Sequence, residues 1–288
     1  STTDSLLAFT REDTDAALIN AWAPRLCFDA REPFLPLAAG CTVLRTPGKS
    51  PSSKFDLDPE GGYVIEYAIW WDWDIQHLYE LEHVWVYLNA NGELVRVEAS
   101  AHGDKLDMTS DDAPLPLIDK RITLYSEPGK HALGASLAWM HNIAEHSRLC
   151  CGEHAGNGGI HTGNPFGAKA FGNPDAADHR RASLYMQRRA FEPSYDFSQV
   201  IDLRDVICVP WDDLARWIPV RIQWWCAELR RSVPHLRAIL LDCGDTIIDE
   251  ATEIRDENDI VQTGDPIPGG VQMVRDLYAN GYTLALVA

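Results

Sequence analysis

The sequence lacks long apolar runs and paired cysteines. It has no stretch of about 18 apolar residues, so we expect no membrane-spanning helix. Residues 1–5 do not read as a basic region leading into an apolar one, so we expect no uncleaved signal peptide and predict a cytoplasmic protein, or a secreted one if a signal was removed earlier. The 7 cysteines lack C-x-x-C spacing, which favours reduced thiols over a disulfide framework.

Basic residues are also scarce. The chain has 43 acidic against 25 basic residues, a formal net charge of −18. Such a surface repels phosphate backbones and anionic membranes, so nucleic acid is not an expected partner. The 288 residues are 45% hydrophobic and contain no internal repeat, which is enough for two domains or one large one.

Several segments have clear secondary-structure patterns. Residues 63–71, 84–88 and 94–99 are rich in β-branched and aromatic types, and the last two flank a turn at residues 89–93. Pairing across that turn brings His102 back toward residues 77–82. Helical patterns cover residues 11–22, 133–149 and 211–229, the last with an expected break at Pro219.

The segment from His77 to Leu88 places polar residues directly before an apolar strand. Side chains alternate along a strand, so Glu80 and Glu82 share a face, with His77 just before them and Asp72 and Asp74 across the preceding turn. One imidazole with several carboxylates suits a divalent ion such as Mg²⁺, Ca²⁺ or Mn²⁺. The alternative is a charged strand end that simply faces water.

Two further histidines lie at strand ends near this cluster. His102 follows the second strand of the hairpin, and His131 follows the predicted strand at residues 121–125. Each of these two histidines is a candidate metal ligand, a candidate hydrogen-bond partner of a metal ligand, or a candidate substrate contact. The alternative is an ordinary hydrogen-bonded histidine.

Three motifs in this region resemble one protein group: His77-x-x-Glu80-x-Glu82-His83-Val84, Ala99-Ser100-Ala101-His102-Gly103 and Gly129-Lys130-His131-Ala132. Their order is similar to that in the necrosis-inducing toxin-like proteins and a related vacuolar-sorting family, over roughly residues 20–135. That resemblance implies a β-sandwich holding a divalent cation through a His-Arg-His-Asp-Trp-Glu run.

Within that run His77 matches the first histidine, Glu80 the aspartate and Glu82 the glutamate. Tyr79 and Leu81 depart from it, standing where the family has histidine and tryptophan. A further family ligand is an upstream aspartate, for which Asp72 and Asp74 both remain candidates.

The pattern changes at residues 237–250. A continuous apolar run there predicts a strand buried on both faces of a parallel sheet, with Asp242 at its carboxyl end. Residues 267–282 predict a helix with a Pro-Gly entry and a Gly stop, and residues 283–288 predict another strand. The order is that of a β-α-β unit.

This unit resembles the start of the haloacid dehalogenase-like (HAD-like) hydrolases, mostly Mg²⁺-dependent phosphohydrolases. The resemblance implies that Asp242 is the nucleophile and Thr246 the threonine of the first motif. Gly244 stands where the general acid-base aspartate is normal, which puts turnover in question. The family's later motifs are absent, so we expect a fragment of a longer protein that is inactive as a phosphatase by itself.

Together these patterns predict a mainly β sandwich with peripheral helices over residues 1–234, followed by the first β-α-β unit of a Rossmann-like α/β domain over residues 236–288. The expected function of the parent protein is Mg²⁺-dependent hydrolysis of a small phosphate ester. One alternative is a non-enzymatic module that binds a glycan or lipid head group through Mg²⁺ or Ca²⁺. Another is a metal-assisted hydrolase in the sandwich, using His77, Glu80, Glu82, His102 and His131. The oligomeric state is left open.

Overall fold

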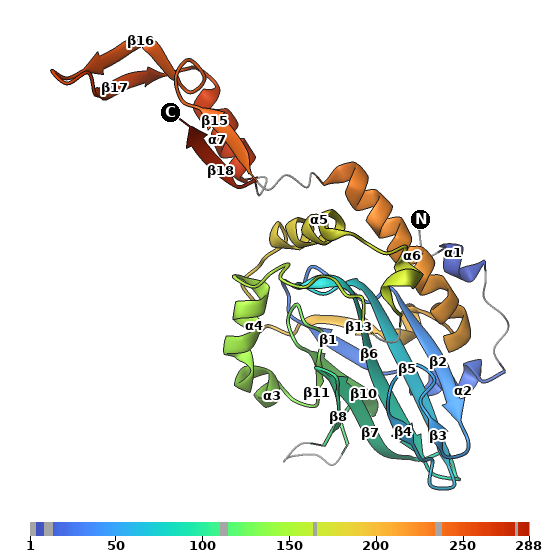
Figure 1. The fold of residues 1–288 in the computed structure, drawn as a ribbon. Helices are drawn as coiled ribbons and strands as arrows, with labels where there is room; N and C mark the ends of the chain where they lie inside the picture. Colours follow the sequence, from blue (N-terminus) through green and yellow to red (C-terminus); the bar gives the residue numbers. More distant parts are fainter. Residues whose placement is uncertain are drawn as a thin grey trace. The chain divides into compact units, whose positions relative to one another are not determined.

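The computed structural model describes residues 4–8, 14–109, 115–163, 166–233, 238–279 and 282–287 (Figure 1). The chain divides into two compact units, Ser1–Val233 and Pro234–Ala288. Each is described by itself. Within the described ranges, no helix combines the length and the apolar character needed to cross a membrane.

The first unit is built on two β-sheets. The larger has seven strands in the order β14-β2-β5-β6-β7-β8, with β12 added beside β6. Its strands are β2 (Ala38–Leu44), β5 (Tyr63–Trp73), β6 (His77–Leu88), β7 (Leu94–Ala101), β8 (Asp104–Asp107), β12 (Gly159–Ile160) and β14 (Ile207–Pro210). The predicted strands and the turn between β6 and β7 are confirmed.

The smaller sheet has five strands in the order β11-β10-β1-β13, with β9 beside β10. They are β1 (Arg25–Phe28), β9 (Leu117–Ile118), β10 (Arg121–Ser126), β11 (Leu133–Gly134) and β13 (Gln199–Asp202). A separate two-stranded ribbon is formed by β3 (Gly48–Lys49) and β4 (Asp56–Leu57).

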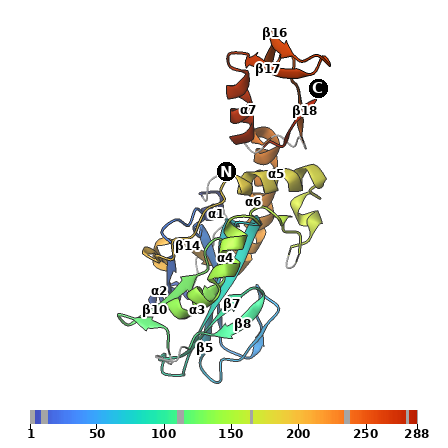
Figure 2. The ribbon, with the colours of Figure 1, turned by 90° about the vertical axis from the view of Figure 1, so that its left-hand side faces the viewer.

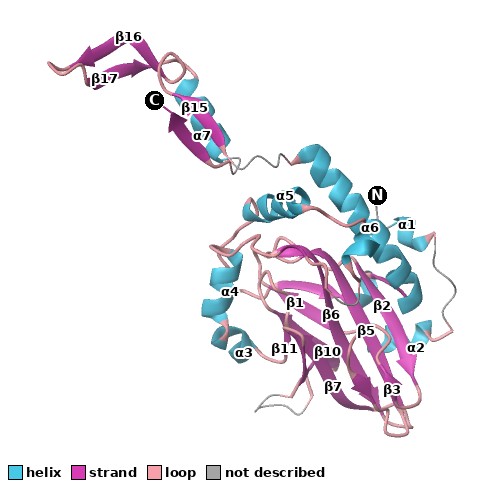
Figure 3. Cartoon of the chain, in the orientation of Figure 1, coloured by secondary structure: helices cyan, strands magenta, loops and turns pink. Residues whose placement is uncertain are grey.

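Helices lie around these sheets (Figure 3). They are α1 (Asp4–Leu7), α2 (Ala16–Trp22), α3 (Leu137–Asn142), α4 (Ala144–Cys151), α5 (Ala176–Gln187) and α6 (Trp211–Ser232), with short 3₁₀ turns η1 (Ala168–Phe171) and η2 (Leu203–Asp205).

The core forms on both faces of β5. Neighbouring side chains in a strand point to opposite faces, and here Trp70 and Trp71 are both fully buried. The Trp71 ring lies 6.4 Å from Phe28 of β1 in the smaller sheet, and the Trp70 ring lies 6.3 Å from Trp217 of α6. The larger sheet is therefore covered by the smaller sheet on one face and by α6 on the other, a β-sandwich-like arrangement with peripheral helices.

Helix α6 does not break at Pro219, contrary to the prediction. A proline inside a helix costs about 3 kcal/mol through a lost hydrogen bond and a clash with the preceding turn. Here Leu214 and Trp217 before it, and Ile222 and Cys226 after it, are all buried against the rest of the unit. Packing on both sides of the proline offsets that cost and keeps one continuous helix.

The second unit contains a β-α-β order. Strands β15 (Ile239–Asp242) and β18 (Leu284–Val287) pair in parallel, and α7 (Gly270–Ala279) lies between them in sequence. The hairpin of β16 (Ile248–Arg255) and β17 (Val261–Pro266) lies at one end of this unit (Figure 2).

The prediction that residues 239–242 are buried on both faces is wrong for the described structure. Leu240 of β15 is 69% exposed and Leu286 of β18 is 62% exposed. A two-stranded sheet has no neighbouring strands or second helical layer to cover these side chains. The described part of the unit is thus smaller than a Rossmann-like domain.

Candidate functional site

A cavity of about 880 Å³ opens at the end of the larger sheet where β5 turns into β6. The loop between β3 and β4, the start of β6, the turn after β7 and helix α4 all contribute to its wall. The polar lining residues include Lys49, Ser52, Lys54, His77, Glu80, Glu82, Ser100, His102, Lys130, His146 and His161.

Three of the predicted metal ligands come together at this turn. Asp74, His77 and Glu80 each offer a ligand atom within 4.8 Å of the others. Asp74 also shapes the turn, because its Oδ1 accepts hydrogen bonds from the amides of Gln76 at 2.6 Å and His77 at 2.7 Å. Its Oδ2 lies 3.4 Å from Nε2 of His77. The tight turn between β5 and β6 therefore brings Asp74 and His77 close together.

The orientation of His77 leaves one ring nitrogen for a ligand. Its Nδ1 lies 2.9 Å from the carbonyl oxygen of Tyr79. The other ring nitrogen, Nε2, faces Oδ2 of Asp74. Tyr79 has a φ of 51°, which is unusual for a bulky residue in a strand. This local distortion presents the Tyr79 carbonyl to His77.

Glu80 and Glu82 both line the cavity. The Glu80 Oε1 accepts a hydrogen bond from the Leu81 amide at 2.9 Å. Glu82 is buried and accepts a hydrogen bond from the Ser100 hydroxyl. Burial, and next the neighbouring charge of Glu80, raise the pKa of Glu82 well above its usual value. The ionised form of Glu82 is therefore disfavoured in the folded chain. Glu82 does not belong to the close group of Asp74, His77 and Glu80.

Lys130 is a site residue that the sequence reasoning missed. It follows β10 in the chain, and its ammonium forms a buried ion pair with Asp74. Burial by itself would lower the pKa of Lys130, but the carboxylates of Asp74 and Glu80 outweigh it, and the pKa is raised. The lysine compensates part of the negative charge beside the cavity.

Asp72 lies away from this group, which corrects its assignment as a metal candidate. The guanidinium of Arg221, on α6, holds its carboxylate, with Nη2 to Oδ2 at 2.6 Å and Nε to Oδ1 at 3.0 Å. The Trp70 indole also donates to Oδ1 at 3.1 Å. Asp72 therefore belongs to the contact between the sheet and α6. Its partner lies 149 residues away in the sequence, so local spacing could not reveal it.

The two other predicted histidines have different surroundings. His102 lines the cavity, and its Nε2 lies 2.7 Å from Oε2 of Glu127. His131 is fully buried, stacked on Trp71 at 4.7 Å, with Nε2 3.3 Å from Glu32. Such burial excludes a substrate contact by His131, and a supporting role behind the site remains a prediction.

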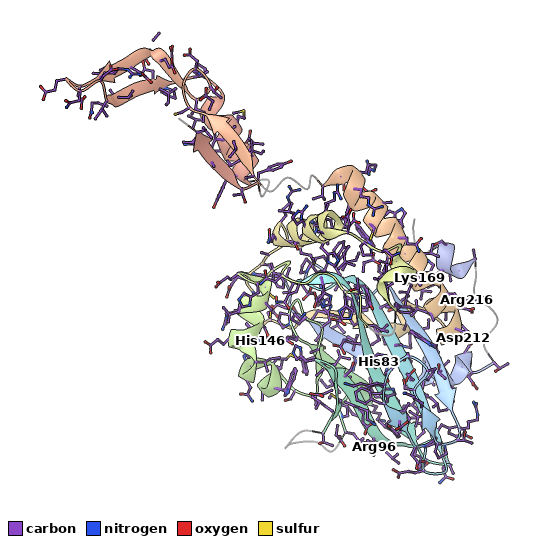
Figure 4. The ribbon with its side chains drawn as sticks, in the orientation of Figure 1. His83, Arg96, His146, Lys169, Asp212 and Arg216 are labelled. Atoms are coloured by element: carbon purple, nitrogen blue, oxygen red, sulfur yellow. The ribbon has the colours of Figure 1, made fainter. Side chains whose placement is uncertain are left out.

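Two more histidines reach the cavity from distant segments. His146 lies on α4 (Figure 4), and His161 follows β12. Strand β12 pairs in parallel with His77 and Leu78, and this pairing brings the His161 ring to 5.2 Å from that of His77. Burial, then the nearby His77, lower the pKa of His161. The glycine-rich segment around residues 152–163 carries no local sequence signal for this pairing.

The two residues assigned to phosphoryl chemistry lie in the second unit. Asp242 ends β15 and Thr246 follows in the next turn, and both are exposed. The space beside Gly244 is taken by the carboxylate of Glu250, whose Oε1 lies 1.8 Å from where a Cβ would be. Two exposed residues on a two-stranded sheet give the phosphohydrolase prediction no support.

Comparisons with known proteins complete this description. No protein-family model matches the chain, and no curated protein matches it. Among solved structures the chain is similar to NLPPya in complex with glucosamine, at 19% identity and a TM-score of 0.30, covering 43% of this chain and 69% of that one. NLPPya in complex with mannosamine matches at 21% identity and a TM-score of 0.31, over 44% and 72%. A structure described as a toxin fold for microbial attack and plant defense matches at 19% and 0.30, over 44% and 72%.

Proposed function

We propose that the first unit is a module that binds a sugar through a divalent metal ion. Asp74, His77 and Glu80 would hold a divalent cation at the wall of the cavity, and hydroxyl groups of the ligand would complete its coordination. The observation that carries this proposal is the position of these three side chains, with ligand atoms within 4.8 Å of one another beside a cavity of about 880 Å³.

The residues present fit a hard or borderline divalent ion. Two carboxylates and one imidazole match Mg²⁺, Ca²⁺ or Mn²⁺ better than an ion that prefers thiolates. A cation held nearby would favour the ionised form of Glu82, whose pKa is raised by burial and next by the charge of Glu80. Either the Lys130 ammonium and the ion would both contact the Asp74 carboxylate, or the ion would displace the ammonium. When bound, the ion would supply an attractive charge for ligand oxygens.

The size of the cavity and the mixed charge of its wall suit a small polar ligand. Its volume lies within the range of small-molecule sites, about 300–1,000 Å³. The Glu80 carboxylate lines the wall together with Lys49, Lys54 and Lys130, so the wall offers both acceptors and donors to the hydroxyl groups of a sugar. An amino sugar adds an ammonium that the Glu80 carboxylate would attract.

Titration calorimetry of the full chain with glucosamine and with glucose tests this proposal, because the two sugars differ by one ammonium group. We expect heat of binding in the presence of Mn²⁺ or Ca²⁺, tighter for glucosamine, and none after chelation. His77→Gln should weaken sugar binding at least about tenfold, whereas the exposed His141→Gln should not change it. Sugar binding that is equally strong with chelator, or no binding of any sugar by the metal-loaded chain, would refute the module.

A further inference from the structure

A second group of ligand-type side chains shares no residue with the group of Asp74, His77 and Glu80. His102 comes from the turn between β7 and β8, Glu127 follows β10, and His146 lies on α4. One ligand atom from each lies within 4.8 Å of the others. We propose that these three residues form a second metal site, selective for a transition ion such as Zn²⁺.

Glu127 is the fixed ligand of this group. Its side chain is fully buried, and its Oε1 accepts a hydrogen bond from the Ser147 hydroxyl at 2.8 Å. Its Oε2 is turned toward Nε2 of His102 at 2.7 Å. A buried carboxylate is costly unless a cation or several hydrogen bonds stabilise it. A metal ion between His102 and Oε2 would stabilise this buried carboxylate in place of the imidazole proton.

His102 is held in this position at a conformational cost. Its φ is 51°, and that of the following Gly103 is 81°. Two successive positive φ values are typical of a tight hairpin turn, where Asn-Gly or Asp-Gly is the usual pair. A histidine in such a conformation is uncommon, and strained residues of this kind are concentrated at ligand sites. The turn directs the imidazole toward Glu127.

His146 completes the group from the side of α4 (Figure 4). Its ring lies 5.7 Å from that of His102 in an edge-to-face arrangement. Its Nε2 also lies 3.5 Å from Sγ of the buried Cys150, one helical turn later. The helix therefore places a soft sulfur atom beside the His146 imidazole.

This donor set differs in kind from that of the first site. Two imidazoles and one carboxylate form a set typical of Zn²⁺ sites that keep a position open, whereas Mg²⁺ and Ca²⁺ prefer oxygen ligands. His102 and His146 both line the cavity. An ion held there could bind a group of the same ligand, so the cavity would present two different cations.

Titration of the full chain with Co²⁺ tests this site, since Co²⁺ is a coloured substitute for Zn²⁺ and four-coordinate Co²⁺ absorbs strongly in the visible range. We expect visible bands that Zn²⁺ abolishes. His146→Gln should weaken Co²⁺ binding at least about tenfold, and because His146 is exposed this change should leave the fold intact. His141→Gln is the matched control on neighbouring α3 and should bind Co²⁺ normally.

Glu80→Gln separates the second site from the first. If the two sites are independent, Glu80→Gln loses Mn²⁺ or Ca²⁺ binding but keeps the Co²⁺ bands, and His146→Gln does the opposite. Co²⁺ binding that is lost in Glu80→Gln but unchanged in His146→Gln would overturn the second site and leave the first. Absence of any Zn²⁺ or Co²⁺ binding by the unmodified chain would overturn it as well.

Discussion

The helix-covered face of the β5–β6 hairpin and its cavity end stabilise carboxylates in different ways. On the helix side, Asp72 receives two nitrogens of Arg221 and the indole of Trp70. Two residues further along the chain, Asp74 shares Lys130 with a crowded set of acidic groups. The first region holds its carboxylate on an arginine and an indole. The second holds Asp74 on Lys130 and two backbone amides beside the cavity, where burial and next the charge of Glu80 raise the pKa of Glu82.

Under the proposed function, this difference separates a structural charge from one that is available to a ligand. A buried pair that is fully matched fixes one packing arrangement and has no capacity for a further ligand. A group of carboxylates with too few cations beside it lowers the free energy of unfolding. A cation that binds to the group raises this free energy again. Three changes, from the largest expected effect to the smallest, test whether the two regions differ in this way.

Arg221→Met should have the largest effect. It keeps the long apolar stem of the side chain but leaves Asp72 buried without its cation, so we expect a loss of about 3–5 kcal/mol in the free energy of unfolding, measured by urea denaturation. Adding Asp72→Asn to this variant should restore a large part of the loss.

The matched control for this change is Arg231→Met, on the same helix. Arg231 pairs with Glu228, but its side chain is 74% exposed and that of Glu228 is 27% exposed, and exposed pairs contribute about 0–1 kcal/mol. If the two arginine variants lose equal stability, the matched-pair description of the helix side is wrong.

Asp178→Asn should have an intermediate effect that depends on pH. The buried Asp178 of α5 is held by Arg230 of α6, with contacts of 2.6 and 2.8 Å. The hydrogen bond from Arg230 lowers its pKa. Because the pKa of Asp178 is lower in the folded chain than the value of about 3.9 in the unfolded chain, its ionised form stabilises the fold above about pH 3.9. This stabilisation is lost as pH falls through the pKa of Asp178 in the folded chain.

We therefore expect Asp178→Asn to cost about 1–3 kcal/mol at pH 7 and progressively less below pH 4. Urea denaturation over a pH series measures this difference. A penalty that stays constant down to the acid limit of folding would show that the charge of Asp178 is not what stabilises the contact between α5 and α6.

Glu82→Gln should have the smallest effect and the opposite sign. Burial and the charge of Glu80 raise the pKa of Glu82, so its ionised form opposes folding. This loss in the free energy of unfolding is absent below about pH 4.3, the pKa of glutamate in the unfolded chain. It grows as pH rises toward the pKa of Glu82 in the folded chain. In chelator, the variant should be more stable than the unmodified chain at pH 8, by about 1 kcal/mol, and equal to it near pH 4. A loss of stability at pH 8 would contradict the proposed charge excess.

Local pattern was sufficient for the elements that carry the first site. Richness in β-branched and aromatic residues predicted β5 and the apolar second half of β6, and the short turn between the strands placed Asp74 across from His77. Period two also placed Glu80 and Glu82 on the same cavity wall. These relations all depend on fewer than fifteen residues of chain, over which backbone geometry determines position.

Residues brought in from distant segments could not be predicted in this way. Arg221 reaches Asp72 from α6, Lys130 reaches Asp74 across 56 residues, and His161 arrives through the pairing of β12 with β6. Each depends on how sheets and helices pack, which a single sequence does not encode locally. Which of the two aspartates lies beside His77 and Glu80 therefore depends on these long-range contacts of Arg221 and Lys130.

Metal binding by three otherwise matched chains tests the central claim most directly. Mn²⁺ affinity, measured by calorimetry, should be retained in the double variant Asp72→Asn/Arg221→Met, because these residues stabilise the contact with α6. It should fall at least about tenfold in Glu80→Gln. Loss of Mn²⁺ binding in the double variant, with binding unchanged in Glu80→Gln, would place the ion on the helix side and contradict the account.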